Sequence, residues 1–136
     1  MSGIRVLVFD GPRQFHIDER PTPQPAAGEV RIRIAFVGIC GADLHGYTGE
    51  SGRRVAGMVM GHEASGWIEA LGPGVRGPEI GTSVTFNPSL ACDGVCGHQI
   101  ENHCSDLRVI GVTPEIQGAF ADAIVVPANR VVPLGA

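Results

Sequence analysis

Three segments of this 136-residue sequence carry side chains that could bind a metal ion. The first is Gly38–His45, where Cys40 follows an apolar run, is flanked by Gly38 and Gly41, and is followed by Asp43 and His45. A thiol at the end of a buried strand can face a cleft, and a nearby carboxylate or imidazole can support it. The alternative interpretation is a buried, inert cysteine with Asp43 capping the turn.

The second segment is the tripeptide Gly61-His62-Glu63. Adjacent side chains on a regular strand point to opposite faces, so both could face one ion only where the backbone is irregular. Gly61 permits such an irregularity. Together with Cys40, the imidazole and the carboxylate make a set of nitrogen, oxygen and sulfur ligands for Zn²⁺ that leaves one position open. The alternative is an ordinary surface pair.

The third segment is a polar stretch that holds Cys92, Cys96 and Cys104. Asp93, His98 and His103 lie among these cysteines. Three clustered thiols in a reducing compartment indicate a closed structural zinc site. A disulfide plus one free cysteine is the alternative.

The N-terminal sequence indicates the compartment in which the protein works. Charged Arg5 and Asp10 lie within or directly after the first apolar run. This is not the pattern of a signal peptide, so we expect a cytoplasmic protein whose cysteines remain reduced. No apolar run approaches the roughly 20 residues that span a bilayer, which argues against a membrane protein.

The charge composition excludes further classes of function. The net charge is −4, and all 10 basic residues are arginine. No basic surface for nucleic acid is expected, and Schiff-base chemistry on a lysine is excluded.

The elements that must position these residues are predicted to be short strands. The chain holds 20 glycines and 10 prolines distributed among aliphatic runs, which is typical of many strands joined by turns. We predict strands at Ile4–Phe9, Phe15–Asp18, Glu29–Val37, Val55–Met60, Ala64–Leu71, Ser83–Phe86, Ala119–Val126 and Arg130–Leu134. Cys40–Tyr47 is expected to form a loop or a single helical turn. The predicted fold is mainly β, with few short helices and a Cys-rich lobe, about residues 88–110, inserted into a partly open barrel.

Several motifs in this order resemble the zinc-containing medium-chain dehydrogenases, which include alcohol, polyol and threonine dehydrogenases. The resemblance covers essentially the whole chain and rests on Gly38–Tyr47, Gly61–Gly66, Gly72–Val75, Gly81–Val84 and the pair Ala119–Asp122 and Val125–Ala128. It implies that residues 1–136 form the GroES-like catalytic domain of such an enzyme.

The same resemblance assigns roles to the candidate residues. Cys40 and His62 would be ligands of a catalytic zinc, Glu63 would be a ligand or near-ligand, and Asp43 would orient His62. The bound ion would act as a Lewis acid on an alcohol or carbonyl substrate. Cys92, Cys96 and Cys104 would belong to a structural zinc site.

Three features depart from the family pattern, one of which is Thr82 in place of the usual Asp. Ala42 stands where the family usually has a Ser or Thr that relays the alcohol proton, and His45 is the nearby substitute. The lobe has three thiols rather than four, so His98, Asp93 or His103 would complete a tetrahedron, and we expect His98.

The resemblance also implies a following Rossmann domain that binds NAD or NADP. No Gly-x-Gly-x-x-Gly unit between a strand and a helix is found in these residues, so no cofactor-binding residue is assigned. We therefore expect an isolated N-terminal domain that binds zinc and is inactive alone, while an oligomer of a full-length enzyme stays open. The alternatives are a non-enzymatic zinc-binding interaction module and a co-chaperonin, although the latter needs no metal site.

Overall fold

The structure is a computed structural model, and it describes residues 3–135. Its elements, in chain order, are β1 (Gly3–Gly11), β2 (Gln14–Pro21), β3 (Glu29–Val37), α1 (Gly41–Thr48), β4 (Ala64–Leu71), β5 (Ser83–Phe86), β6 (Ser89–Leu90), the 3₁₀ turn η1 (Glu101–His103), β7 (Arg108–Val109), β8 (Ala123–Pro127), η2 (Ala128–Arg130) and β9 (Val131–Pro133).

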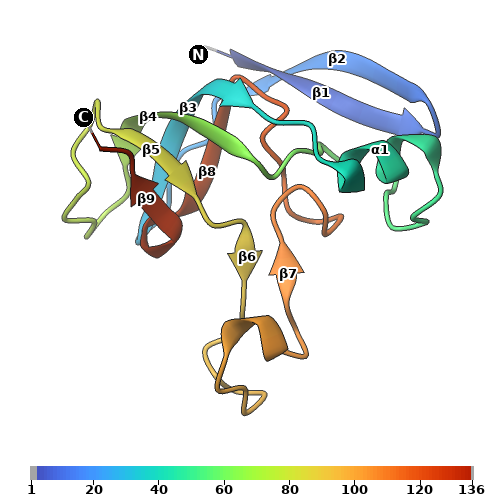
Figure 1. The fold of residues 1–136 in the computed structure, drawn as a ribbon. Coiled ribbons are helices and arrows are strands. Elements are labelled where there is room, and N and C mark those ends of the chain that lie inside the picture. Colours follow the sequence, from blue (N-terminus) through green and yellow to red (C-terminus); the bar gives the residue numbers. More distant parts are fainter. Residues whose placement is uncertain (1–2, 136) are drawn as a thin grey trace.

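The body of the molecule is a five-stranded antiparallel sheet with the order β8-β3-β4-β5-β9. The sheet curls around an aliphatic core that includes Val30, Ile32, Ile68, Val84 and Ile124, all essentially inaccessible to solvent. These are the β-branched residues that alternate on the strands, and burying them drives the sheet to curl. Figure 1 shows this sheet beside α1 and the β1-β2 ribbon.

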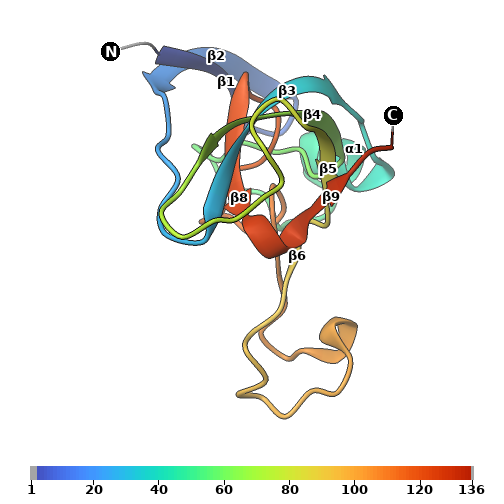
Figure 2. The same ribbon diagram turned by 90° about the vertical axis from the view of Figure 1, so that its left-hand side faces the viewer.

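The β1-β2 hairpin forms a separate two-stranded ribbon. It joins the body through main-chain hydrogen bonds from the Leu7 amide to the Phe120 carbonyl (2.8 Å) and from the Phe9 amide to the Met58 carbonyl (2.9 Å). In both views the ribbon lies against the side of the body opposite the Cys-rich lobe (Figures 1 and 2).

The Cys-rich lobe extends away from the sheet on two short strands. β6 and β7 pair antiparallel at its base and carry η1 and the surrounding turns at its far end (Figure 2). The sequence predicted the lobe but not the two-residue strands that tether it.

The predicted fold class is confirmed: the chain is mainly β, and α1 is its one α-helix among residues 3–135. The strands predicted at Glu29–Val37, Ala64–Leu71 and Ser83–Phe86 have the predicted bounds. The sheet does not close into a full barrel, in agreement with the partly open barrel expected from the sequence.

Two strand predictions are corrected. Val55–Met60 is no strand; Gly57 has φ +93°, which breaks extended pairing, and only Val59 makes an isolated bridge, to Val8. The strand predicted at Ala119–Val126 begins instead at Ala123.

Two predictions near Cys40 are also corrected. The alternation of Val30, Ile32, Ile34 and Phe36 in the sequence predicts that Phe36 lies on the buried face of β3. It is 76% exposed instead, because the register shifts at a bulge between Ile34 and Phe36. The segment expected to be a loop or single turn is the eight-residue helix α1. Among the described residues, no helix has the length and apolar character needed to cross a membrane.

Candidate metal centres

Cys40 stands at the N-terminal cap of α1, directly after β3. Its backbone is extended (φ −86°, ψ 159°), and its amide donates a hydrogen bond of 3.0 Å to Oδ2 of Asp43 in the first turn. This bond satisfies one of the free amides at a helix start and fixes where the helix begins. The Cys40 thiol is thereby held at the junction of strand and helix.

His62 and Glu63 reach the same place through an irregular backbone. Gly61 has φ +96°, and a Cβ there would lie 2.7 Å from Cδ1 and 2.9 Å from the amide nitrogen of Phe120, so the turn requires glycine. The Gly38 amide then donates to the Glu63 carbonyl at 2.7 Å, which brings this turn beside the end of β3.

These constraints gather three candidate ligands into one group, which we call the Cys40 site. One ligand atom from each of Cys40, His62 and Glu63 lies within 4.8 Å of the others. The adjacent side chains of His62 and Glu63 thus face the same point, which is possible only because the backbone is irregular here. A thiolate, an imidazole and a carboxylate suit Zn²⁺ and leave a coordination position for another molecule.

Asp43 lies behind this site. Its side chain is only 3% exposed, and Oδ1 is 3.5 Å from Nδ1 of His62. Neither of these buried atoms has a hydrogen-bond partner among the described residues. Because Nδ1 faces the carboxylate, Nε2 is the imidazole nitrogen that remains for a metal.

The second group lies in the Cys-rich lobe. It contains Cys92, Cys96, His98 and Cys104, whose ligand atoms also lie within 4.8 Å of one another. The three sulfur atoms are 3.4–3.6 Å apart. Sulfur atoms on a tetrahedron with Zn–S bonds of 2.3 Å stand about 3.8 Å apart, so the lobe has nearly the spacing that zinc requires.

His98 completes this group with Nδ1. That nitrogen is 3.1 Å from Sγ of Cys96 and 3.7 Å from Sγ of Cys92. Of the three residues considered for the fourth position, His98 belongs to the group, whereas Asp93 and His103 do not.

The electrostatics of the lobe favour a thiolate at one position. The hydrogen bond with the His98 ring, aided by the backbone amides of His98 and Ser105, lowers the pKa of Cys96 to about 5. For Cys104, the Cys92 amide lowers the pKa, but burial and the neighbouring thiols outweigh it and raise the pKa overall. A bound cation would remove this difference, because metal ligation favours the thiolate of every cysteine.

His45 is separate from both groups. It lies on α1, its side chain is 65% exposed, and Nδ1 is 2.7 Å from Oε2 of Glu50. With Ala42 it lines a polar pocket of about 480 Å³ beside α1. Two arginines also line this pocket, Arg53 and Arg54, and the sequence did not single them out because adjacent arginines in a Gly-rich stretch carry no motif.

Comparisons with known proteins identify the family of this chain. The model of the family described as the alcohol dehydrogenase GroES-like domain matches residues 26–136. Starvation-sensing protein RspB of Escherichia coli K12 is 37% identical over 129 residues, which are 93% of this chain and 38% of that protein. The chain therefore spans less than half the length of this curated relative.

Two solved structures are similar over nearly the whole chain. The alcohol dehydrogenase rspB of Escherichia coli CFT073, complexed with cofactor NADH, superposes with a TM-score of 0.88 at 36% identity, covering 99% of this chain and 39% of that one. A cobalt- and zinc-bound thermostable alcohol dehydrogenase of Pyrobaculum aerophilum superposes with a TM-score of 0.86 at 29% identity, covering 99% of this chain and 42% of that one.

Proposed function

The chain belongs to the alcohol dehydrogenase GroES-like domain family, and from this premise we propose that it is the catalytic domain of a zinc-dependent dehydrogenase. The reaction is oxidation of an alcohol or polyol, or reduction of the corresponding carbonyl, with NAD or NADP. Residues 1–136 form the catalytic domain with its lobe at about 88–110, and a second domain of the enzyme holds the nucleotide. The enzyme works in the cytoplasm.

The convergence of Cys40, His62 and Glu63 beside buried Asp43 is the observation that carries this proposal. The three ligands come from the helix cap and an irregular turn. If these residues served only to stabilise the fold, there would be no need for a thiol, an imidazole and a carboxylate to lie so close together. A closed structural site would use four protein ligands, whereas three leave room for a substrate oxygen.

The protein side of the chemistry is the holding and orienting of groups. Cys40, His62 and Glu63 would hold zinc, which when bound supplies Lewis-acid polarisation of the substrate oxygen. Asp43 Oδ1 lies 3.5 Å from His62 Nδ1 and would accept the Nδ1 proton when zinc is bound, which would fix the tautomer and direct Nε2 to the ion. Oxidation transfers a hydride from the substrate carbon to the nicotinamide and a proton from its hydroxyl to the protein or solvent.

The proton path differs from that of relatives with a hydroxyl side chain at position 42. Ala42 has no proton to exchange, so His45 takes this role. Its ring is exposed and hydrogen-bonded to Glu50 at 2.7 Å, which allows it to pass a proton to solvent.

The Cys-rich lobe holds a second, structural zinc through Cys92, Cys96, Cys104 and His98. The spacing of the thiols and the contact of His98 Nδ1 with two of them support this assignment. A metal there orders a segment that has no apolar core of its own.

The test replaces the matching segment of E. coli RspB with this chain, since rspB of E. coli CFT073 was solved with NADH bound. NAD(P)H formation is followed with simple alcohols and polyols, alone and with Cys40→Ser. We expect turnover that Cys40→Ser abolishes while the zinc of the lobe is retained. A correctly folded chimera that binds NADH but oxidises none of these substrates would favour the non-enzymatic module.

A further inference from the structure

The polar pocket beside α1 has an unusual lining for a site so near the Cys40 site. Its volume is about 480 Å³, and it is lined by Ala42 and His45 of α1, by Glu50, Ser51, Arg53 and Arg54 of the following loop, and by Val112. Pockets of this size accommodate small organic molecules. Two of its side chains are guanidinium groups, and guanidinium groups recognise oxyanions.

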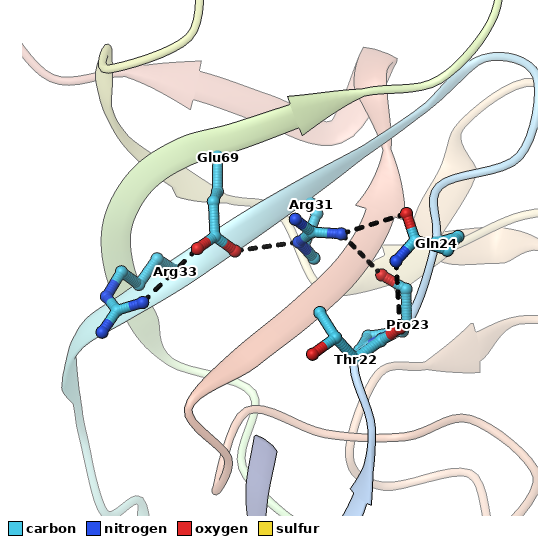
Figure 3. A network of polar contacts seen from close by, with 6 residues as sticks. All are labelled: Thr22, Pro23, Gln24, Arg31, Arg33 and Glu69. Atoms are coloured by element: carbon cyan, nitrogen blue, oxygen red, sulfur yellow. Dashed lines mark hydrogen bonds and ion pairs between the residues drawn. The ribbon is translucent and has the colours of Figure 1, made fainter. Parts of the chain in front are cut away.

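Arg54 differs from the other partly buried arginines among the described residues. Arg20, Arg31 and Arg130 each have a carboxylate oxygen within 4.0 Å, whereas Arg54 has none. Figure 3 shows the usual arrangement: Arg31 donates to Glu69 at 2.8 Å and to the Pro23 carbonyl at 3.1 Å. Arg54 donates one hydrogen bond, from Nη2 to the Ala42 carbonyl at 3.3 Å.

The guanidinium of Arg54 is nevertheless held in place. It crosses α1 at Gly46, where a Cβ would lie only 2.8 Å from both Cγ and Nε of Arg54. Its Nε is buried and has no hydrogen-bond partner among the described residues. Burial lowers the pKa of Arg54, opposed by the charge of Asp43, so the cation is partly desolvated and still charged. Most of its five donors remain available.

Two guanidinium groups and two carboxylates lie in or beside the pocket. Arg53 is exposed and adds a second positive charge at the rim. Glu50 is the one carboxylate in the lining, and its Oε2 lies 2.7 Å from His45 Nδ1, whereas Asp43 is buried behind Arg54. An anion entering the pocket therefore meets the donors of two guanidinium groups, opposed by the charges of Glu50 and Asp43.

The pocket also adjoins the proposed reaction centre. Ala42, which accepts the hydrogen bond from Arg54, is two residues after Cys40 in the chain. Asp43 interacts electrostatically with Arg54 and lies 3.5 Å from His62. None of the three Cys40-site ligands lines the pocket, so a substrate must extend past Ala42 to present a hydroxyl to the Cys40 site.

We infer that Arg54, with Arg53 at the rim, binds the carboxylate of a hydroxy-acid substrate, so that the enzyme prefers polyhydroxy or short-chain hydroxy acids to uncharged polyols. A carboxylate and a guanidinium form two parallel hydrogen bonds, which no neutral hydroxyl can reproduce. This inference rests on the proposed function, because it concerns the substrate of the same site.

The test measures binding of D-gluconate and of sorbitol to the zinc-loaded 136-residue chain by calorimetry or NMR titration. The two probes differ only in a carboxylate against a hydroxymethyl group at one end. We expect gluconate to bind more tightly, and Arg54→Gln to weaken it roughly 10-fold to 100-fold without affecting sorbitol. Arg54→Lys keeps the positive charge but not the paired donors of the guanidinium group, so it should give an intermediate affinity for gluconate. The matched control is Arg76→Gln, which changes an exposed arginine outside the pocket.

Each contrary outcome is informative. Equal affinity for gluconate and sorbitol would overturn the inference, as would equal weakening by Arg54→Gln and Arg76→Gln. Tighter binding of inorganic phosphate or NADH at the same residues would assign the pocket to a cofactor phosphate instead. If Arg54→Gln does not fold, Arg54→Lys provides the test. An unchanged affinity for gluconate in that variant would contradict binding of the carboxylate by the guanidinium group.

Binding and turnover separate this inference from the proposed function. Gluconate binding through Arg54 in a chain that supports no hydride transfer in the RspB chimera would retain the inference and refute the dehydrogenase. Turnover of polyols in the chimera with no preference for gluconate would do the reverse.

Discussion

Asp43 connects the Cys40 site to the rest of the fold at the scale of single residues. One of its oxygens accepts from the Cys40 amide at 3.0 Å, and the other lies 3.5 Å from His62 Nδ1. The same buried carboxylate therefore caps the helix that carries the thiol, and we propose that it also selects the tautomer of the imidazole.

Replacing this carboxylate tests its role. We expect Asp43→Asn to weaken metal binding at the Cys40 site by about 10–100-fold, because the amide is a poorer acceptor for the Nδ1 proton. The measurement is competition with a chromophoric chelator. The zinc of the lobe serves as an internal control, and an unchanged affinity at the Cys40 site would show that Asp43 does not act through His62.

His98 is the residue that best tests whether the lobe holds zinc through four protein ligands. We expect His98→Ala to increase the rate of zinc loss from the lobe strongly, since only three protein ligands remain, whereas His98→Cys should retain the ion with four thiolates. Zinc release to a chelator measures both. His103→Ala, in the same lobe but outside the group, is the matched control. Equal zinc loss in His98→Ala and His103→Ala would disprove the assignment.

At the scale of elements, the fold tolerates a side chain at some glycines and not at others. A Cβ on Gly66 of β4 would overlap the backbone carbonyl of Arg33 on β3, whereas a Cβ on Gly41 at the start of α1 meets nothing within 4 Å. We expect Gly66→Ala to lower the free energy of unfolding by about 3 kcal/mol. Gly41→Ala should be neutral or stabilising by up to about 1 kcal/mol. Chemical denaturation distinguishes them, and similar midpoints would contradict this packing.

The β1-β2 ribbon is attached to the body partly by charge. Arg5 on β1 donates to Asp122 through its backbone amide (2.9 Å), Nε (3.1 Å) and Nη2 (2.9 Å). These hydrogen bonds hold the pKa of Asp122 below its usual range. Because the folded state lowers this pKa, the pair contributes stability above the ordinary pKa of about 4 and loses it as pH falls through the lower, folded value.

Asp122→Asn should therefore be destabilising near neutral pH but not in acid. Both side chains are more than one-third exposed, so solvent screening keeps the effect small, a fall of a few degrees in Tm at pH 7. Thermal melts of both proteins from pH 7 to pH 2 measure it. A difference that grows as the pH falls would reverse the predicted sign.

The limits of prediction also lie at the scale of elements. The alternation of Val30, Ile32 and Ile34 was sufficient to predict β3, because burial of one face is a local pattern. The sequence could not show that a bulge turns Phe36 outward, or that Gly57 prevents residues 55–60 from pairing, because both depend on neighbouring segments.

The candidate ligands were predictable because Cys and His are uncommon and their spacing follows a known pattern. The group formed by Cys92, Cys96, His98 and Cys104 was anticipated in this way. Arg54 was not predictable from the sequence. What marks it out is that Gly46 leaves space for its side chain and that no carboxylate pairs with it, and both depend on the folded structure.

At the scale of the whole molecule, the two candidate metal centres belong to different structural units. The Cys40 site lies at the junction of β3, α1 and the turn at Gly61, whereas the second group lies in the Cys-rich lobe, beyond β6 and β7 (Figure 1). Their ligand sets also differ, since one has three protein ligands and the other has four. We therefore expect the two ions to bind independently, with the lobe the tighter and the Cys40 site only partly occupied after purification.

Zinc content per chain, measured during titration with a chelator, tests the central claim most directly. The account predicts two classes of zinc: a tight one that Cys40→Ala and His62→Ala leave intact, and a weaker one that either substitution abolishes. The same titration on Cys104→Ala should lose the tight class and keep the weaker one. Full occupancy of two zinc ions per chain that survives His62→Ala would contradict the assignment of the Cys40 site, and with it the proposed reaction.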